Sequence, residues 1–424
     1  MADKVLYWVL RVCMWPLGYL PFSWLRAMGR IVGLLGYYCM HTWRKRALSH
    51  IALAHDLHLS HEEIVAVAKQ SFQNLAINCL EYPKLSTSKR LSSVIQCENP
   101  ETADRLYGQG HGIVFFCGHQ ANWEVLFLDG TQRMKGVAIG KPIKNKHLYQ
   151  WIVAMRERFG GKIISPKNAL REGLRALKQG VFLGIVGDQA MPDSRYSFPF
   201  LGRRAFNSTA PALLAHRTNS PLIFAETRRV PGGYRIRYSD PVWPNQEKPI
   251  EQEVVRMMDC MLGLLQDSIR KNPGEWLWQH NRWKQQTPQV VYYRFRHDAV
   301  CVVLPENEQL IAQTHVLRQI YPLEFITLLV PETMRHVPLP PADEIVYYNH
   351  LSETLRFDLR PKLVLDFTGY PPLKQHYRRL SAFEVISLDE LKQLAKAHGP
   401  VENLHDVLTR ALCRPGTLWR TNAV

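Results

Sequence analysis

From residue 110 onward, short apolar runs closed by Gly, Asp or Pro alternate with stretches whose apolar residues recur at helical spacing. Gly112–Cys117 and Val181–Val186 have the length and composition of buried strands, and Ala169–Leu177 lies between them as a predicted helix. Pro211–His216 and Pro221–Glu226 continue the alternation. Because strands that alternate with helices build mainly parallel sheets, the pattern predicts an α/β fold.

The same alternation starts again after a polar, proline-containing break at Gln285–Gln289. Five further strands are predicted, at Ala299–Leu304, Glu324–Val330, Glu344–Tyr348, Lys362–Phe367 and Glu384–Leu388. Helices are predicted between them, at Asn307–Ile320, Leu373–Leu380 and Leu388–His398. These elements indicate a second, smaller α/β domain of Rossmann-like layout. The sequence contains neither G-x-G-x-x-G nor G-x-x-x-x-G-K-[ST] there, so no phosphate loop supports nucleotide binding.

The first 40 residues are unusually apolar and aromatic. Leu6–Leu25 has the length of a bilayer-crossing helix, about 20 residues. It contains Arg11, Pro16 and Pro21, however, which is typical of a segment that enters the membrane interface shallowly or as an imperfect span. The basic cluster Arg44–Arg46 follows, as expected on the cytoplasmic side of a membrane. The alternative is a pair of aromatic core helices.

The positive charge is confined to one part of the chain. The protein carries 53 Lys and Arg against 37 Asp and Glu, a formal net charge of +16. Residues 291–424 hold 15 of each sign, which leaves 38 basic and 22 acidic residues in residues 1–290. A field of this sign attracts nucleic acid, anionic lipid head groups or an acidic protein.

Length, charge and hydrophobic pattern together predict the domain organisation. A chain of 424 residues exceeds what one hydrophobic core usually serves. We therefore expect a membrane-associated segment at residues 1–40, a first α/β domain at 41–290 and a smaller α/β domain at 291–424.

The eight cysteines show neither metal-site spacing nor the pattern of a disulfide framework. No C-x-x-C pair occurs, which argues against structural zinc. Free thiols in a reducing compartment fit the scattered positions better. Cys117 lies two residues before His119, and we interpret it as a small buried residue at a strand end rather than as a nucleophile.

Gly118–Glu124 directly follows the strand predicted at Gly112–Cys117. His119 is therefore expected at the carboxyl end of a strand, where open α/β sheets place reactive groups, and histidine is suited to accept a proton near neutral pH. Glu124 does not share a helical face with His119, but from the first turn of a following helix its carboxylate can fold back onto the imidazole. We predict a catalytic pair in which Glu124 orients His119. The alternative is a core histidine and a solvated glutamate.

The heptapeptide Gly118–Glu124 resembles the signature of the bacterial lipid A late acyltransferase family, relatives of glycerol-phosphate and lysophospholipid acyltransferases. Five later segments resemble further motifs of that family in the same order: Lys141–Asn145, Arg156–Gly160, Gly187–Gln189, Phe198–Gly202 and Pro273–Lys284. The resemblance covers about residues 20–284 and implies a glycerol-phosphate-acyltransferase-like sheet with flanking helices. Lys141 stands where Arg is usual, and the chain continues for 140 residues past Lys284, where the family typically ends.

The resemblance also implies a reaction. His119 acts as general base on an acceptor hydroxyl, which then attacks the thioester carbonyl of an acyl donor. Substrate contacts are implied for Lys141, Asn145, Arg156, Arg158, Asp188 and Arg282. Arg156 and Arg158 are candidates for stabilising the oxyanion or binding phosphate, and Asp188 follows a predicted strand, where a second functional carboxylate is expected. No cofactor and no metal ion are implied.

The implied donor is acyl carrier protein, whose acidity matches the basic field of residues 1–290, and the implied acceptor is an anionic lipid A precursor. The expected location is the cytoplasmic face of the bacterial inner membrane. Three alternatives stay open: an acyltransferase for another glycolipid or a lysophospholipid, a non-catalytic membrane scaffold, and a nucleic-acid binder. The last is disfavoured because the basic residues form no recognisable nucleic-acid-binding motif.

Overall fold

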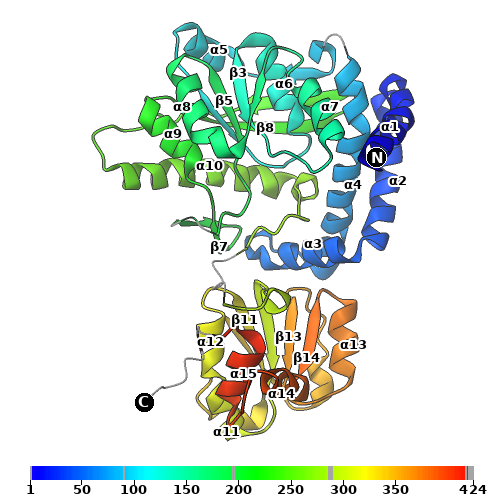
Figure 1. Ribbon diagram of the computed structural model, residues 1–424, viewed down its shortest axis with the longest axis vertical. Helices are drawn as coiled ribbons and strands as arrows, with labels where there is room; N and C mark the ends of the chain where they lie inside the picture. Colours follow the sequence, from blue (N-terminus) through cyan, green and yellow to red (C-terminus); the bar gives the residue numbers. More distant parts are fainter. Residues whose placement is uncertain are drawn as a thin grey trace. The chain divides into compact units, whose positions relative to one another are not determined.

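The computed structural model describes residues 2–88, 91–192, 194, 196–284, 290–415 and 418, which divide into two compact units (Figure 1). Unit 1 comprises Met1–Cys39 and Asp56–Leu277, and unit 2 comprises Met40–His55 and Trp278–Val424. The predicted break at Gln285–Gln289 lies outside the described residues. Unit 2 joins a segment from near the N-terminus to the C-terminal strands, which the sequence pattern did not indicate. The domain boundaries expected at residues 40 and 290 stay predictions.

A seven-stranded sheet forms the centre of unit 1. Its order is β1 (Ile95–Cys97), β9 (Gly233–Tyr238), β8 (Leu222–Val230), β2 (Val114–Cys117), β5 (Phe182–Val186), β3 (Gly136–Ile139) and β4 (Lys162–Ile164). All neighbouring strands run parallel except the β8–β9 hairpin. The strands predicted at 112–117 and 181–186 are confirmed as β2 and β5. A sheet of this kind confirms the α/β class for unit 1.

Helices flank this sheet (Figure 1). They are α5 (Glu101–Gly108), α6 (Glu124–Arg133), α7 (Lys146–Arg156), α8 (Ala169–Lys178), α9 (Ala210–Thr218) and α10 (Ile250–Lys271). The short strands β6 (Ser197–Phe200) and β7 (Arg203–Phe206) form a separate hairpin. All four residues of β2 are buried, because the strand has sheet neighbours on both sides and helices over its faces. The central strand therefore holds the loop that follows it in a fixed place.

Two glycines allow α2 (Phe22–Cys39) to pack closely along α4 (His61–Thr87) (Figure 1). A Cβ atom added at Gly29 would lie 2.8 Å from the Cα of Ile77, and one added at Gly33 would lie 2.3 Å from the Cα of Gln73. Both distances are too short for any side chain. The two glycines lie one turn apart on the face of α2 that contacts α4, so the two backbones meet there directly.

The other face of α2 and much of α1 (Ala2–Met14) expose apolar side chains. The exposed set includes Trp8, Val9, Val12, Trp24, Met28, Ile31, Val32 and Leu35. Trp24, for example, has a relative exposure of 65%. Within the described part of the chain, no helix combines the length and the apolar character that crossing a bilayer requires. The predicted insertion of this segment into a membrane interface stays a prediction.

Unit 2 contains a five-stranded parallel sheet in the order β12 (Glu344–Tyr348), β11 (Phe325–Pro331), β10 (Ala299–Val303), β13 (Leu363–Asp366) and β14 (Glu384–Ser387). The five strands predicted in this region are confirmed within one or two residues. Numbered along the chain, the order is 3-2-1-4-5, which is the doubly wound arrangement of a Rossmann-like sheet. Its helices include α13 (Pro372–Arg379), α14 (Leu388–Lys396) and α15 (Leu404–Leu412) (Figure 1).

The single helix predicted at Asn307–Ile320 is wrong. The structure has a short α11 (Glu308–Ala312), a 3₁₀ turn at Gln313–His315 and a short α12 (Val316–Ile320). The buried Thr314 donates a hydrogen bond from its hydroxyl to the carbonyl of Ile311, at 2.6 Å. A threonine that bonds back to the preceding turn competes with regular helical hydrogen bonding, which accounts for the break.

A buried cluster of ionisable groups connects α3 (His41–Leu53) to the sheet of unit 2. The ammonium group of Lys362 lies 2.7 Å from Asp298 Oδ1 and 2.7 Å from His50 Nε2. His50 Nδ1 lies 3.1 Å from the carbonyl oxygen of Trp278. Burial and the nearby charge of Lys362 lower the pKa of His50, so the imidazole is neutral at pH 7. Because each member needs the others for its hydrogen bonds, α3 belongs to the core of unit 2.

We expect Gly33→Ala to lower the free energy of unfolding by about 1–3 kcal/mol, the usual cost of overpacking, because the new methyl group meets the backbone of α4. Gly263→Ala is the matched control. Gly263 also lies inside a helix, α10, but a Cβ atom there has no neighbour within 4 Å. Helix propensity alone then predicts stabilisation of up to about 1 kcal/mol. Urea denaturation measures both variants, and a stabilised Gly33→Ala would contradict the close packing.

Candidate functional site

His119 lies two residues beyond the end of β2, at the carboxyl edge of the sheet of unit 1. Cys117, the last residue of β2, pairs with Val186, the last residue of β5. Because the two strands are parallel and in register, the residue two positions after each strand arrives at the same place. These residues are His119 and Asp188. The prediction that His119 follows a strand is confirmed.

Asp188 holds the imidazole of His119. Its Oδ1 lies 2.6 Å from His119 Nδ1, and its Oδ2 accepts hydrogen bonds from the backbone N–H of His119 at 2.7 Å and from the indole N–H of Trp276 at 2.8 Å. The Asp188 side chain is almost fully buried. Burial by itself would raise the pKa of this carboxyl group, but the charge and hydrogen bonds of His119 and the Trp276 bond hold it well below 3.8. Asp188 is therefore a carboxylate at neutral pH.

A carboxylate at Nδ1 decides the tautomer of His119. An ionised Asp188 only accepts hydrogen bonds, so Nδ1 carries the proton and Nε2 keeps its lone pair. The Nε2 atom lies 3.4 Å from the amide nitrogen of Gln189. The ring of Trp123 packs edge-on against the imidazole, at a centroid distance of 4.7 Å. With 15% of its side chain exposed, His119 is positioned to accept a proton from a molecule that reaches this edge of the sheet.

The prediction that Glu124 orients His119 is wrong in the described structure. Glu124 is the first residue of α6, and its carboxylate forms a two-pronged ion pair with Arg156 at the end of α7. One of the two bonds joins Glu124 Oε2 to Arg156 Nε, at 2.7 Å. The strand register already places Asp188 against Nδ1, so the orienting position is occupied. Glu124 instead fixes Arg156 beside the loop that bears His119.

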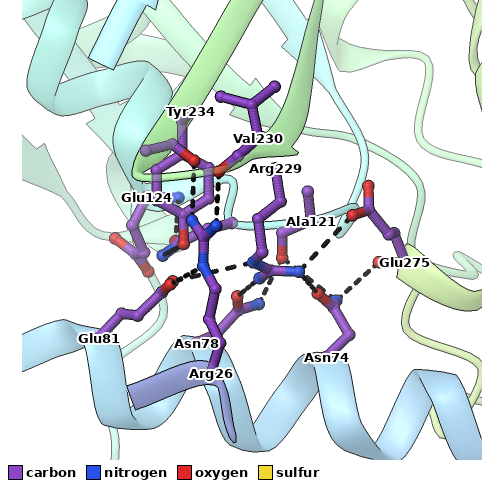
Figure 2. Close-up of polar contacts among 12 residues, drawn as sticks. Arg26, Asn74, Asn78, Glu81, Ala121, Glu124, Arg229, Val230, Tyr234 and Glu275 are labelled. Atoms are coloured by element: carbon purple, nitrogen blue, oxygen red, sulfur yellow. Dashed lines mark hydrogen bonds and ion pairs between the residues drawn. The ribbon is translucent and has the colours of Figure 1, made fainter. Parts of the chain in front are cut away.

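The loop after β2 is held from outside the sheet by α4. Ala121 adopts a left-handed backbone conformation, with φ of 47°, which is costly for a residue with a side chain. Its carbonyl oxygen accepts hydrogen bonds from the side-chain amides of Asn74 and Asn78, both buried on α4. Its N–H donates to the carbonyl of Glu275, at 2.9 Å. Figure 2 shows these contacts converging on the loop.

Sequence reasoning missed the asparagines and the role of Trp276. Asn74 and Asn78 are one helical turn apart, so they share a face of α4. Together with Ser71 and Glu81 they form a polar row at helical spacing, which is a signal that could have been found. The role of Trp276 as a hydrogen-bond donor to Asp188 had no local signal, because more than eighty positions of the sequence separate the two residues.

The residues predicted to bind substrate lie in different places. Asn145 caps α7 by accepting hydrogen bonds from the N–H groups of His147 and Leu148, and its amide donates to the carbonyl of Asp3 on α1. Lys141 is exposed on the loop after β3. These contacts give Asn145 a structural role and leave Lys141 accessible to an anion.

Both arginines of the Arg156–Gly160 segment have protein partners. Arg158 donates to the carbonyl oxygens of Leu85 and Ser88, at 2.6 Å and 2.5 Å, and so connects the end of α4 to the turn after α7. Arg156 and Asp188 belong to the immediate surroundings of the loop that bears His119, through Glu124 and through the imidazole itself. Arg282 is fully buried and belongs to unit 2.

A narrow apolar cavity begins beside the loop that bears His119. Cys117 and Trp123 line one part of it, and the rest is formed by strands β2, β3 and β5 and by α6: Phe115, Leu126, Phe127, Ala138, Phe182 and Gly184 are among the lining residues. Its volume is about 60 Å³. Burial raises the pKa of the Cys117 thiol, which favours the interpretation as a buried residue over that as a nucleophile. Among the described residues, no group of three His, Cys, Asp or Glu side chains has a metal-binding arrangement.

Comparison with known protein families identifies this chain's relatives. The model of the bacterial lipid A biosynthesis acyltransferase family matches residues 1–285 of the chain, which is more than half of its length. The matched region contains His119, Glu124, Arg156 and Asp188. No curated protein matches the chain.

The buried Asp188 carboxylate predicts a pH-dependent contribution to stability. We expect Asp188→Asn to have a lower free energy of unfolding than the wild type at pH 7. Because the folded-state pKa is depressed, the stabilisation is present above about pH 4, near the unfolded value, and is lost as the pH falls further. Urea denaturation at pH 7, 5 and 3 measures the difference. The control Asp240→Asn, at an exposed position, should show no such trend. If the free energy of unfolding of Asp188→Asn differs from that of the wild type by the same amount at all three pH values, the ion pair is contradicted.

Proposed function

The chain belongs to the family of bacterial lipid A biosynthesis acyltransferases, and from this we propose that it transfers a fatty acyl chain from acyl carrier protein to a hydroxyl group of a lipid A precursor. The observation that carries the proposal is the His119–Asp188 pair at the carboxyl edge of the sheet. It supplies a general base with a defined tautomer. A sugar or hydroxyacyl hydroxyl needs such a base before it attacks a thioester.

The proposed reaction uses Nε2 of His119. This atom takes the proton of the acceptor hydroxyl while the oxygen attacks the thioester carbonyl. The carbon–sulfur bond of the resulting tetrahedral intermediate then breaks, and the imidazolium returns the proton to the departing thiolate. Asp188 stabilises the imidazolium between these two steps.

Three further residues of the site receive proposed roles. The ion pair with Glu124 leaves Nη1 of Arg156 without a hydrogen bond to any described residue, and we assign it to the oxyanion or a phosphate of the substrate. Glu124 positions Arg156 for that role. Lys141 is exposed and available for an anionic group of either substrate.

The apolar cavity under Trp123 is the proposed entrance for the acyl chain. It is adjacent to His119 and lined almost entirely by aromatic and aliphatic side chains. At about 60 Å³ it holds only a small part of a fatty acyl chain. Binding of a longer chain therefore requires the surrounding side chains to move.

The donor is proposed from charge. Residues 1–290 carry an excess of 16 positive charges, which favours association with the acidic acyl carrier protein. Association steered by charge weakens with ionic strength. Transfer from acyl carrier protein should therefore fall more steeply with added salt than transfer from the corresponding acyl-coenzyme A.

A transfer assay with acyl carrier protein as donor and a lipid A precursor as acceptor tests the proposed function. We expect His119→Ala to lower kcat by about 10²–10⁴, the usual contribution of a general base. Asp188→Asn should also lower kcat, because a neutral amide no longer fixes the Nδ1–H tautomer or stabilises the imidazolium that forms during the reaction. Glu124→Gln should lower the rate as well, because Arg156 loses its ion-pair partner. Normal turnover by His119→Ala, or transfer only to a lysophospholipid, would refute the proposal.

We also propose that the apolar face of α1 and α2 binds the cytoplasmic face of the inner membrane. Replacing Trp24 and Ile31 with serine should weaken binding to vesicles that contain anionic lipid, because two large exposed apolar groups are lost. Flotation with vesicles measures the bound fraction. The control replaces Tyr293 and Leu323, two exposed apolar residues of unit 2, with serine. Equal loss of binding in both double variants would contradict the assignment.

A further inference from the structure

A second cavity, of about 720 Å³, lies between α2, α4, the tip of the β8–β9 hairpin and the segment after α10. Four basic residues line it, namely Arg26, Arg30, Arg229 and Lys271. Gln70, Gln73 and Asn74 of α4, the hairpin tip Val230–Gly232 and the acidic Glu275 are among the other lining residues. This cavity differs from the apolar one beside Trp123 in both chemistry and lining residues.

Two of the four basic side chains, the buried Arg26 and the largely buried Arg229, are fixed by hydrogen bonds. Arg26 donates to Glu81, at 2.8 Å, and to the backbone carbonyls of Val230 and Gly233, on the two sides of the β8–β9 turn. Arg229 donates to the side-chain oxygens of Asn74 and Asn78, at 2.5 Å and 2.6 Å. Figure 2 shows both guanidinium groups side by side above α4. They are therefore held in place before any ligand arrives.

The other two basic side chains are exposed and have no protein partner among the described residues. Neither Arg30 nor Lys271 forms a hydrogen bond or ion pair there. Exposed cations that line the same cavity as fixed cations fit an anion that bridges them.

The cavity carries an uncompensated positive charge. Four basic residues and one carboxylate, Glu275, line it, and a second carboxylate, Glu81, lies behind the lining against Arg26 and Arg229, which leaves an excess of two positive charges. Burial lowers the pKa of Arg229. The negative charges of Glu81 and Glu275 oppose this change, whereas the positive charges of Arg26 and Arg30 add to it. Nε of Arg229 is buried, lies 4.0 Å from Glu81 and has no hydrogen-bond partner in the part of the chain that the structure describes. Bringing cations together in a partly desolvated cavity is costly, and a bound dianion would offset the cost.

We infer that this cavity binds a phosphate monoester group and, resting on the proposed function, that the phosphate is carried by the acceptor lipid. Phosphate provides two negative charges and several acceptor oxygens in a geometry that matches guanidinium groups. The ligand arrives from a lipid surface because α2 carries Arg26 and Arg30 toward the cavity and exposes Trp24, Met28 and Ile31 elsewhere on the same helix.

Phosphate binding is connected to the catalytic loop through Arg229. The arginine holds the oxygens of Asn74 and Asn78, and the amide nitrogens of the same side chains hold the carbonyl of Ala121. His119 lies two residues before Ala121. An acceptor bound in the cavity thus stabilises the conformation of the loop that positions the base.

Inorganic phosphate is the probe for the first test. At constant ionic strength, adding phosphate to the full-length protein should raise the Tm of the wild type in a saturable way. The double variant Arg30→Gln/Lys271→Gln should lose this response, since both residues are exposed and their replacement leaves the buried network intact. The matched control Lys167→Gln/Arg237→Gln removes two exposed cations of unit 1 away from the cavity and should keep it. An equal response of both double variants, or none in the wild type, would overturn the site.

Kinetics with two acceptors identify the source of the phosphate. For the phosphorylated lipid A precursor, Arg30→Gln/Lys271→Gln should raise KM roughly tenfold, the loss of about 1.4 kcal/mol of binding, with little change in kcat. For the same acceptor after phosphatase treatment, cavity and control variants should have equal KM values. If Arg30→Gln/Lys271→Gln instead has an unchanged KM but binds phosphatidylglycerol vesicles more weakly than the wild type, the cavity binds a bilayer lipid and the assignment to the acceptor is overturned. If the wild type transfers to no acceptor, the proposed function fails while the phosphate titration still reports on the cavity.

Discussion

The parallel register between β2 and β5 is the constraint on which the rest of the site depends. Cys117 and Val186 are partners, so the chains leave the two strands side by side and bring His119 and Asp188 together two residues later. Asp188 accepts three hydrogen bonds in a buried position. A shift of one residue in either strand would separate the pair and leave a buried carboxylate without partners, which is costly enough to hold the register.

The surrounding structure holds the loop after β2 in a conformation that it would not adopt alone. The left-handed backbone at Ala121 persists because α4 supplies two amides and the segment after α10 supplies a carbonyl. The position of α4 in turn depends on its contact with α2, where Gly29 and Gly33 let the helices meet backbone to backbone. A chain of direct contacts therefore runs from the exposed apolar face of α2 to His119.

Unit 2 follows a different principle, since polar groups in its core join segments that are distant in the sequence. His50 comes from α3, Asp298 immediately precedes β10 and Lys362 immediately precedes β13. A buried lysine and aspartate are tolerable only when both are paired, so the cluster binds α3 to the sheet specifically. This interaction explains why the segment Met40–His55 belongs to unit 2 together with the C-terminal strands.

The sequence by itself determined all five strands of the sheet of unit 2 and the central strands β2 and β5 of unit 1, because apolar runs of strand length depend only on local pattern. It also located His119 at a strand end, and its ordered motifs identified the family over residues 1–285. It did not determine the partner of His119. Glu124 was the nearest acidic residue along the chain, but the tertiary structure pairs His119 with Asp188 and Glu124 with Arg156. Hydrogen-bond partners in a parallel sheet are set by which strands are neighbours, and β2 and β5 are adjacent although β3 and β4 lie between them in sequence. That adjacency arises only when the whole sheet assembles, which is why tertiary structure alone decided the partner.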